Sequence, residues 1–371
     1  MSKKIAYVHA LPIEIFPPAT NTIRLLGEHP DFELSVWSSA NTNDLQEFDC
    51  LGAAIHRPKY PTSERRFKRA KLYLSWHWQC ALALRRFAPD AIISVEPHSA
   101  YAVWIYYYLL GGNARLFIHH HEYNSQAEYD KPGMALLKYG HALESRLLFK
   151  RAEWISQTND NRLRLLREET PELPEEKFDI WPNYPPANWL SHAKPKLPGD
   201  KIRLVYVGSA SFEDTFIREI TEWAAEHEKQ VSLTIGGYNV RPDVWEWLET
   251  KNFPNVELKK AGWKYDELPR ILGQFDVGLI LYRGNTPNFV YNAPNKLFEY
   301  WACGLEVWYP SVMKQISELS DQQSCPALKK IDFQQLKGVS PSLTNNIPTS
   351  PDTIARFTAE AALEPLIARL S

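Results

Sequence analysis

The sequence predicts an α/β protein that consists of two Rossmann-like domains and a C-terminal helix. Three observations lead to this fold class. The chain has 371 residues, more than one hydrophobic core usually supports. Short runs rich in Val, Ile and Tyr alternate with helical patterns in two successive series, as in parallel sheets with crossover helices. A Pro-rich stretch at residues 180–199, in which neither helix nor central strand can continue, separates the two series.

The first domain, residues 1–186, is expected to contain six strands and the helices that connect them. Its predicted strands are Ile5–Ala10, Phe32–Ser38, Ala53–Arg57, Ala91–Glu96, Leu116–His121 and Trp154–Thr158. Its helices are expected near residues 19–28, 64–87, 99–110, 134–150 and 160–169.

The second domain, residues 187–349, repeats this alternation with five strands. They are expected at Ile202–Val207, Val231–Gly236, Val256–Ala261, Val277–Tyr282 and Glu306–Tyr309, with helices near 215–227, 242–250, 265–275 and 292–303. Residues 311–349 carry few periodic signals and are expected to be irregular. A last helix is predicted over 350–371, with Ser350 as N-cap and Pro351 in the first turn, packing back on the domains.

Composition excludes several classes of protein. The hydrophobic fraction of 44% is ordinary for a folded chain, and the net charge of -2 argues against nucleic-acid binding. The four cysteines have no metal-ligand spacing and are expected to be reduced core thiols. Because there is neither a secretory signal nor an apolar run of about 20 residues, we expect a cytoplasmic protein that does not cross the membrane.

Several cofactor motifs are missing. No G-x-G-x-x-G follows the first strand, and the sequence contains no P-loop and no Asp-x-Asp pair. We therefore expect no dinucleotide cofactor and no metal. If a diphosphate binds, protein groups must neutralise its charge.

The segment Asn292–Gly304, which reads NAPNKLFEYWACG, follows a strand and opens a helix. The first amides of a helix lack intrahelical partners, so a diphosphate can dock there with Lys296 nearby. Glu299 lies one turn further on, where a carboxylate can accept both hydroxyls of a ribose. The alternative is an amphipathic helix in which Lys296 and Glu299 form a solvated i,i+3 pair.

This segment resembles the donor-site helix of glycosyltransferases of the two-domain (GT-B) type, especially the retaining family-4-type enzymes. Weaker matches to other motifs of the same family occur in the expected order at Val207-Gly208-Ser209, at Gly262-Trp263 and at Ile180-Trp181-Pro182-Asn183. The resemblance implies two Rossmann-like domains that face each other across a cleft and close around a nucleotide-sugar donor. It also implies that Glu299 binds the ribose, that Gly208 and Ser209 approach the diphosphate, and that Trp263 lies near the base.

The sequence departs from the family pattern at two places. Tyr291 occupies the position of a glutamate that holds the transferred sugar, so Asn292 or main-chain amides would take over that role. The basic pair that usually follows the glycine turn is replaced by Ser211-Phe212-Glu213-Asp214. The phosphate charge would then be neutralised by Lys296, by Arg283 or Arg218, and by the helix start at Asn295.

In the first domain, polar residues gather at the predicted carboxyl ends of the strands, where open parallel sheets bind ligands. They are His9, Glu96-Pro97-His98 and His119-His120-His121-Glu122. His121 and Glu122 resemble the pair that GT-B enzymes place against the donor sugar, and Glu122, Glu96, His98 or His121 could act as a general base. Alternatively, His119 and His121 could share a metal, or the histidines could be core or surface residues.

Residues 57–86 form a basic, aromatic stretch that suits an anionic membrane surface. Between His56 and Phe87 the only acid is Glu64, against nine cations. The aromatic residues there include Tyr73, Trp76 and Trp78. The alternative is a solvated face with both tryptophans in the core.

The expected function is therefore transfer of a sugar from a nucleotide-diphosphate donor to a glycan or lipid-linked acceptor, in surface polysaccharide or glycolipid synthesis. A nucleotide-sugar epimerase on the same fold is the alternative enzyme. A catalytically silent GT-B protein that binds nucleotide or glycan is the alternative from another class. Retention and inversion both remain open at this point.

Overall fold

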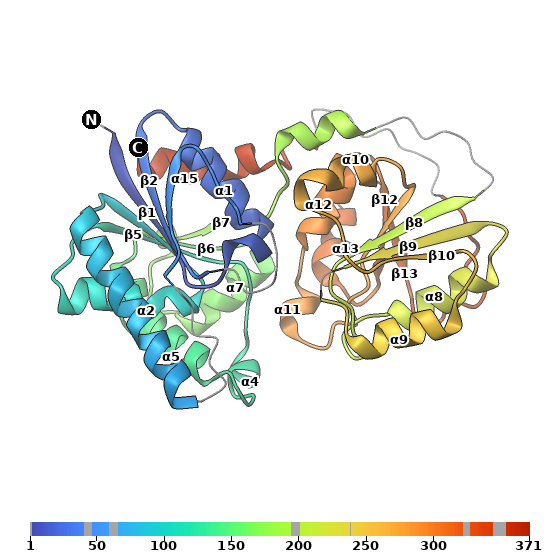
Figure 1. Ribbon diagram of the computed structural model, residues 1–371, viewed down its shortest axis with the longest axis horizontal. Coiled ribbons are helices and arrows are strands. Elements are labelled where there is room, and N and C mark those ends of the chain that lie inside the picture. Colours follow the sequence, from blue (N-terminus) through green and yellow to red (C-terminus); the bar gives the residue numbers. More distant parts are fainter. Residues whose placement is uncertain are drawn as a thin grey trace. The chain divides into compact units, whose positions relative to one another are not determined.

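The computed structural model describes residues 2–40, 47–58, 66–193, 201–237, 239–321, 327–343 and 354–371, without the side chains of 66–70 and 321. The chain divides into two compact units. Unit 1 comprises Met1–Asn183 together with Ala362–Ser371, and unit 2 comprises Tyr184–Ala361 (Figure 1).

Unit 1 is built on a seven-stranded parallel sheet with the order β3-β2-β1-β4-β5-β6-β7. This is the doubly wound order, in which strand succession reverses between β1 and β4. The strands are β1 (Lys3–His9), β2 (Phe32–Ser38), β3 (Ala53–His56), β4 (Ala91–Val95), β5 (Arg115–His120), β6 (Trp154–Gln157) and β7 (Phe178–Ile180).

Helices cover this sheet because their apolar faces and the central strands share one core. Trp76 and Leu84 from α2 are buried there with Ile92 of β4 and Leu116 of β5. The helical segments are η1 (Ile13–Ile15), α1 (Pro17–Glu28), α2 (Arg66–Phe87), η2 (Pro97–Ser99), α3 (Ala100–Trp104), η3 (Ile105–Leu109), α4 (Gln126–Tyr129), α5 (Ala135–Leu143), η4 (Glu144–Leu148), α6 (Phe149–Arg151), α7 (Asp160–Glu169) and η5 (Glu175–Lys177).

Unit 2 has a six-stranded parallel sheet with the order β10-β9-β8-β11-β12-β13. Its order also reverses once, between β8 and β11. The strands are β8 (Ile202–Val207), β9 (Val231–Gly236), β10 (Val256–Lys259), β11 (Val277–Leu279), β12 (Glu306–Pro310) and β13 (Leu328–Ile331).

Two apolar clusters flank the sheet of unit 2. One includes Ile217 of α8 and Val244 of α9, and the other includes Leu272 of α10, Leu297 of α12 and Ile316 of α13. The helical segments are η6 (Ala187–His192), α8 (Ile217–Glu226), α9 (Pro242–Lys251), η7 (Tyr265–Glu267), α10 (Leu268–Leu272), α11 (Pro287–Val290), α12 (Asn295–Ala302), α13 (Lys314–Asp321) and the long C-terminal helix α15 (Ala359–Leu370), which continues into unit 1.

The predicted fold class is confirmed, and three of the predicted local assignments need correction. Residues 311–349 are not irregular, because they contain α13 and the strand β13. The sequence LKKI of β13 alternates too little to signal a strand. An unpredicted seventh strand, β7, ends at Ile180, where the Pro-rich stretch begins. Helix α15 begins at Ala359 rather than near residue 350; Ser350, Pro351 and Asp352 lie outside the described residues.

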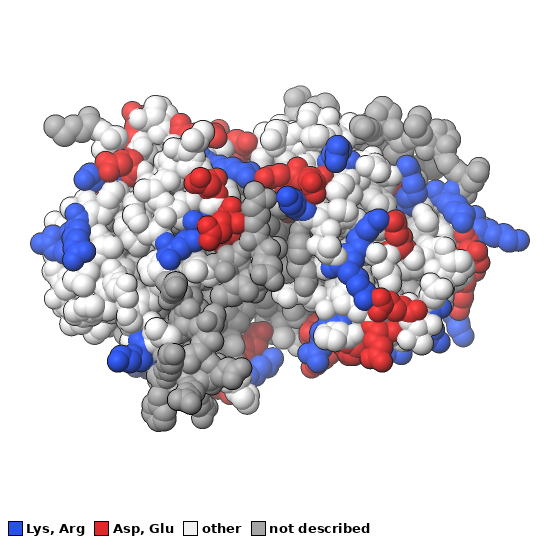
Figure 2. All heavy atoms as spheres, viewed as in Figure 1, with Lys and Arg blue, Asp and Glu red and all other residues white. Residues whose placement is uncertain are grey.

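Charges and thiols agree with the composition. Figure 2 shows acidic and basic side chains interspersed over the face that it displays. Within the described part of the chain, Cys50, Cys80 and Cys303 are free thiols, and Cys325 falls outside it. No helix of the described segments combines the length and the apolar character needed to cross a bilayer.

Candidate functional site

Helix α12 begins where the sequence predicts. Pro294 is its N-cap in an extended conformation (φ -66°, ψ 146°), so the helix starts at Asn295. The Leu297 amide donates to the Pro294 carbonyl at 2.9 Å, which leaves the amides of Asn295 and Lys296 without an intrahelical acceptor. The Oη of the buried Tyr300 accepts a hydrogen bond from the Val207 amide at 3.2 Å, which fixes the helix against the end of β8. Gly304 ends the helical turn with φ 77°.

Lys296 projects from the first turn of α12 toward the end of β8. Its Nζ lies 5.0 Å from the ring centre of Tyr206 and 5.3 Å from that of Tyr282. Burial lowers the pKa of this ammonium, but Tyr282, Tyr206 and Glu299 outweigh burial and the net shift is upward. Among the described residues Lys296 forms no ion pair within 4.0 Å, and its charge is stabilised by the two tyrosine rings and, at longer range, by Glu299.

Gly208 provides the close approach that an anion needs. It follows β8 with φ 139°, a value that other residues rarely adopt, and a methyl group there would overlap Lys296 Nζ. Its amide donates to the Gly236 carbonyl at 2.9 Å, which fixes the turn. The structure thus brings Gly208, the exposed Ser209 and Lys296 together at the carboxyl edge of the sheet.

Glu299 lies one turn after Lys296 and is only 6% exposed. Burial raises the pKa of its carboxyl to about 7, against the opposing effects of Lys296 and of hydrogen bonds from Asn295 and Tyr265. A carboxyl in this state gains from further donors, because each hydrogen bond to its ionised form offsets part of the desolvation cost.

Trp263 lies over the end of β9. A methyl group at Gly236 would overlap its ring, so the indole rests directly against the backbone of Gly236. The ring is half-buried and follows Gly262, which has φ 61°. A half-exposed indole beside the edge of the sheet offers a stacking surface for a planar base.

The other predicted donor residues are less clearly placed. Tyr291 ends α11 with Lys314 Nζ 5.6 Å from its ring centre, and Asn292 is buried just before α12. Arg283 is already engaged, because its guanidinium donates to Glu219 and to the Phe212 carbonyl and lies 4.4 Å from the ring centre of Phe216. Arg218 lies 4.2 Å from the ring centre of Phe212 and 5.2 Å from that of Trp247, so of the predicted cations in the described residues Lys296 is the one on α12 itself.

In unit 1, the predicted histidines meet at the carboxyl edge of the sheet. His121 Nδ1 lies 3.0 Å from Asn183 Oδ1 and 3.3 Å from His119 Nε2, and His119 Nδ1 lies 2.9 Å from Ser156 Oγ. If Nδ1 of His121 carries the proton toward Asn183, its buried Nε2 holds a lone pair with no partner among the described residues. Burial lowers the pKa of His121 to about 4, so the ring is neutral at pH 7.

Glu96 was one of several possible bases, and the structure gives it a defined task. Its Oε1 accepts the amides of His121 at 2.6 Å and Glu122 at 3.2 Å, which fixes the loop after β5. Its backbone has φ 62°, a strained value for a non-glycine residue. Burial raises the pKa of this carboxyl to about 7, and the two amide bonds oppose that shift.

The remaining polar residues of this edge divide into exposed and buried groups. The Glu122 carboxylate is half exposed and pairs with the buried Arg162 at 3.3 Å, and Arg162 also donates to the His121 carbonyl. Burial lowers the pKa of His98 to about 4 and that of His9 to about 3. Both rings are therefore neutral at pH 7.

The triple histidine does not form a common ligand set. His120 points away from His119 and His121, because its Nε2 lies 2.9 Å from the buried carboxylate of Glu144. Within the described segments, no three His, Cys, Asp or Glu side chains are grouped as metal ligands would be. The sequence did not reveal that Asn183, part of the segment Ile180-Trp181-Pro182-Asn183, and Arg162 contact His121, and only their proximity in the fold shows it.

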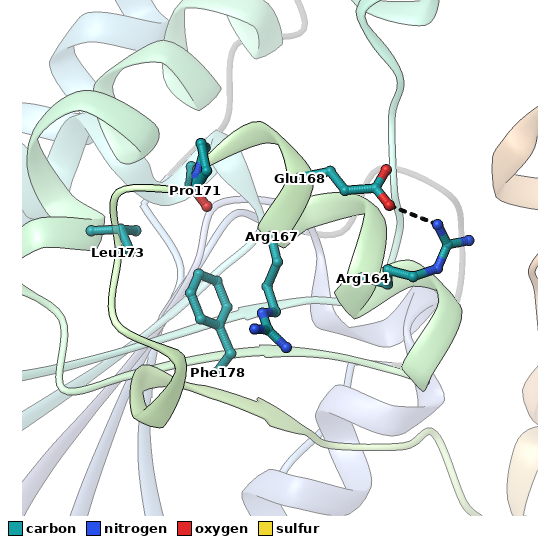
Figure 3. A pocket seen from close by; sticks show the side chains of 7 residues that line it. Arg164, Arg167, Glu168, Pro171, Leu173 and Phe178 are labelled. Atoms are coloured by element: carbon teal, nitrogen blue, oxygen red, sulfur yellow. Dashed lines mark hydrogen bonds and ion pairs between the residues drawn. The ribbon is translucent and has the colours of Figure 1, made fainter.

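A separate hollow of about 450 Å³ lies between α7 and β7, at the amino ends of the strands (Figure 3). It is lined by Arg164, Arg167, Glu168, Thr170, Pro171, Leu173 and Phe178. Its two arginines are paired with Glu168 at 2.7 Å and Glu175 at 2.9 Å. Its cations are therefore ion-paired, in contrast to Lys296 among the described residues.

Comparisons with known proteins place these two sheets in a known architecture. Neither a scan of protein-family models nor a search of curated proteins finds a match. Solved structures match over the whole chain. Sucrose-phosphate synthase from Thermosynechococcus elongatus has a TM-score of 0.70 and 14% identity, with 99% of both chains covered.

HepE of Anabaena, solved with UDP and glucose, has a TM-score of 0.67 and 12% identity, with 99% of each chain covered. A UDP-N-acetylglucosamine 2-epimerase has a TM-score of 0.59 and 11% identity, covering 100% of this chain and 96% of its own. At such identities the likeness concerns the fold. The chain therefore has the GT-B fold that the resemblance of α12 predicted.

Proposed function

We propose that the protein is a glycosyltransferase that moves a sugar from a nucleotide-diphosphate donor to a hydroxyl group of a glycan or lipid-linked acceptor. The observation that carries this proposal is the arrangement at the start of α12. A lysine without an ion-pair partner among the described residues, a glycine turn in contact with it, and the first two amides of α12 lie at one edge of the sheet, with Glu299 one turn away. HepE, which shares the fold, was solved with UDP and glucose.

The donor would be bound by unit 2, with one group for each part of the nucleotide. Lys296 and the first amides of α12 would bind the diphosphate at the Gly208 turn. Glu299 would accept the ribose hydroxyls, and the half-exposed ring of Trp263 would contact the base. Because these groups supply the positive potential themselves, transfer without a metal is part of the proposal.

Transfer breaks the bond between the sugar's anomeric carbon and the diphosphate oxygen and forms a bond to the acceptor oxygen. The acceptor hydroxyl must lose its proton, and the electron pair of the broken bond leaves with the diphosphate. Neutral His121, with the lone pair of Nε2 available, is our candidate for accepting that proton or a hydroxyl hydrogen bond. Lys296 and the helix amides would stabilise the departing diphosphate.

The neutral imidazoles of unit 1 favour an uncharged, hydroxyl-rich acceptor. His9, His98 and His121 are uncharged at pH 7 because burial lowers each pKa, and an imidazole can donate or accept hydrogen bonds. A growing surface polysaccharide or a glycolipid head group has this chemistry. That acceptor class is the narrower part of the proposal.

A second enzymatic function has an observation in its favour, since a UDP-N-acetylglucosamine 2-epimerase shares the fold. An epimerase would convert the nucleotide-sugar without any acceptor. A silent nucleotide-binding protein would bind the donor and leave it intact. The three functions therefore differ in what happens to the donor after binding.

The deciding experiment is a thermal-shift screen of UDP-, GDP-, ADP- and TDP-sugars, followed by analysis of the bound donor by mass spectrometry. We expect one class of nucleotide-sugar to raise the midpoint temperature of unfolding. We also expect release of the nucleoside diphosphate only when a glycan or lipid-linked acceptor is added. Glu299→Ala should abolish the shift, whereas Glu249→Ala, at an exposed ion pair, should retain it. Donor epimerised without acceptor, or bound and never consumed, would contradict the proposal.

A further inference from the structure

Large apolar side chains are exposed together on one group of helices in unit 1. Of the ten large hydrophobic residues that are exposed in the described part of the chain, seven lie on α2, η3, α5 and η4. They are Leu74, Trp78, Tyr108, Leu109, Leu136, Tyr139 and Leu147, and we call them the apolar patch. Tyr139 is 64% exposed and Leu74 is 61% exposed, so these are not marginal cases.

The helices that carry the apolar patch are neighbours. α3 and its continuation η3 contact α2 along one side and α5 with η4 along the other. Tyr101 Oη donates to the Leu136 carbonyl at 2.7 Å, and Tyr108 Oη reaches the Leu147 carbonyl at 3.5 Å. Segments at residues 71–87, 100–110 and 135–151 therefore form one continuous face, which also includes α6.

The charges on this face are almost all positive, and one of its cations, Lys138, pairs with Asp130 at 2.6 Å. Its three segments contain seven cations, namely Lys71, Arg85, Arg86, Lys138, Arg146, Lys150 and Arg151. Their one acid, Glu144, is fully buried against His120. The rest of the chain is acidic enough to bring the total to -2, so this concentration of cations is local.

From this combination we propose that the helical face of α2, α3–η3 and α5–α6 docks on the surface of an anionic lipid bilayer. Leucine, tryptophan and tyrosine side chains insert between lipid head groups, and flanking lysines and arginines attract the anionic lipids. The inference is independent of sugar transfer, because it rests on exposure and charge alone.

A second copy of the chain fits this face less well. A twofold dimer would place the same patch on both sides of the interface, so the cations of one copy would face those of the other. An anionic lipid surface instead complements both the apolar and the charged residues.

The face differs from the stretch predicted from the sequence alone. Tyr73 and Trp76 are buried in the core, and Arg57 pairs with Glu14 at 2.8 Å. Lys59 and Arg65 lie outside the described residues, as do the side chains of Arg66, Lys68 and Arg69. The docking face instead comprises residues 71–87 of α2 together with residues 100–110 and 135–151.

The test is co-sedimentation of the full chain with vesicles of phosphatidylcholine alone or mixed with phosphatidylglycerol. We expect binding only to the anionic vesicles, and binding that weakens as salt is raised from about 0.05 to about 0.5 M. The double variant Leu74→Ser, Tyr139→Ser should lower the partition coefficient about tenfold. The variant Arg85→Gln, Arg86→Gln should lower it similarly, and more at low salt than at high salt.

The matched control is Ile15→Ser, Val312→Ser, which removes exposed apolar residues outside the patch and should bind as the wild type does. Circular dichroism and sedimentation velocity would establish that every variant is folded and would give its oligomeric state. Absence of binding to anionic vesicles at low salt, or equal binding by patch and control variants, would overturn the proposal. A patch variant that dissociates a dimer but still binds vesicles would assign the face to a second copy.

Discussion

The carboxyl edges of the two sheets share a topology and differ in chemistry. In unit 1 the edge beyond β1, β4 and β5 holds buried histidines and the carboxyl of Glu96. In unit 2 the edge beyond β8 and β11 presents a glycine turn, the start of α12 and the ammonium of Lys296. One edge is therefore mostly neutral and hydrogen-bonding, and the other is positive.

This difference indicates how one fold can divide a reaction between its halves. A doubly wound sheet fixes where a ligand binds, and the loops after its strands decide which charge it carries. Burial keeps His121 uncharged with a pKa of about 4, while the surroundings of Lys296 raise its pKa. Proton handling is thus expected in unit 1 and anion binding in unit 2.

The largest expected effect tests the edge of unit 1. Replacing His121 by Ala should lower kcat by about 10²-fold or more, because its Nε2 is the proposed acceptor of a proton or hydroxyl hydrogen bond. Donor affinity should remain within about threefold of the wild type, since unit 2 is unchanged. Steady-state kinetics measure kcat and calorimetry measures donor affinity, with His192→Ala as the control. An unchanged kcat in His121→Ala would show that His121 takes no part in the reaction.

The next effect tests the positive edge. Lys296→Met should weaken binding of a nucleoside diphosphate about 10²-fold, because it removes the cation beside the first amides of α12. Lys260→Met, which removes an exposed cation paired with Glu249, should leave affinity unchanged. Isothermal titration calorimetry at fixed ionic strength gives both values, and equal losses in the two variants would mean only general charge attraction.

Glu299 should produce a smaller, pH-dependent effect. The pKa of its carboxyl is raised to about 7 by burial, so the acid is partly protonated near neutrality. An ionised carboxylate accepts ribose hydroxyls better, and affinity for an uncharged nucleoside should therefore rise between about pH 6 and pH 8. In Glu299→Gln this rise should disappear; a rise that persists would assign it to another group.

The smallest effect concerns the stability of unit 1. The pKa of Glu96 is raised to about 7 by burial, so between its ordinary value and 7 the folded state binds more protons than the unfolded state. The free energy of unfolding then falls as pH rises through this window. Glu96→Gln keeps an oxygen for the His121 and Glu122 amides, and should gain about 2 kcal/mol relative to the wild type between pH 5 and pH 8.

Glu96→Ala supplies the comparison, because it leaves both amides without their acceptor. We expect Glu96→Ala to be less stable than Glu96→Gln by about 2 kcal/mol at every pH, because neither variant titrates at this position. Urea unfolding at pH 5, 6, 7 and 8 would measure all three proteins. A difference between wild type and Glu96→Gln that does not vary with pH would contradict the assigned titration.

Several strands rich in large apolar residues were predictable from the sequence. Phe32–Ser38, Ile202–Val207 and Val231–Gly236 form strands with the predicted bounds. The edge strands β7 and β13 were missed because they are short and half polar, so neither shows the apolar run of a central strand. Pairing with a neighbouring strand, rather than local pattern, determines these two.

The candidate site was predictable where one segment carries several groups. The start of α12 contains Lys296 and Glu299 at a helical spacing, and Pro294 marks its first turn. The ion pair of Arg283 with Glu219 joins residues far apart in sequence, and no local pattern reveals it. The same holds for Asn183, which reaches His121 across 62 positions.

The central claim is that the start of α12 binds the diphosphate while Glu299 binds the ribose. Its most direct test is calorimetric titration of the wild type, Lys296→Met and Glu299→Ala with a nucleoside and with the matching nucleoside diphosphate. Lys296→Met should lose the extra affinity that the diphosphate confers and keep its affinity for the nucleoside. Glu299→Ala should lose affinity for both ligands by the same factor. If Lys296→Met and Glu299→Ala both bind the two ligands as tightly as the wild type does, the claim is contradicted.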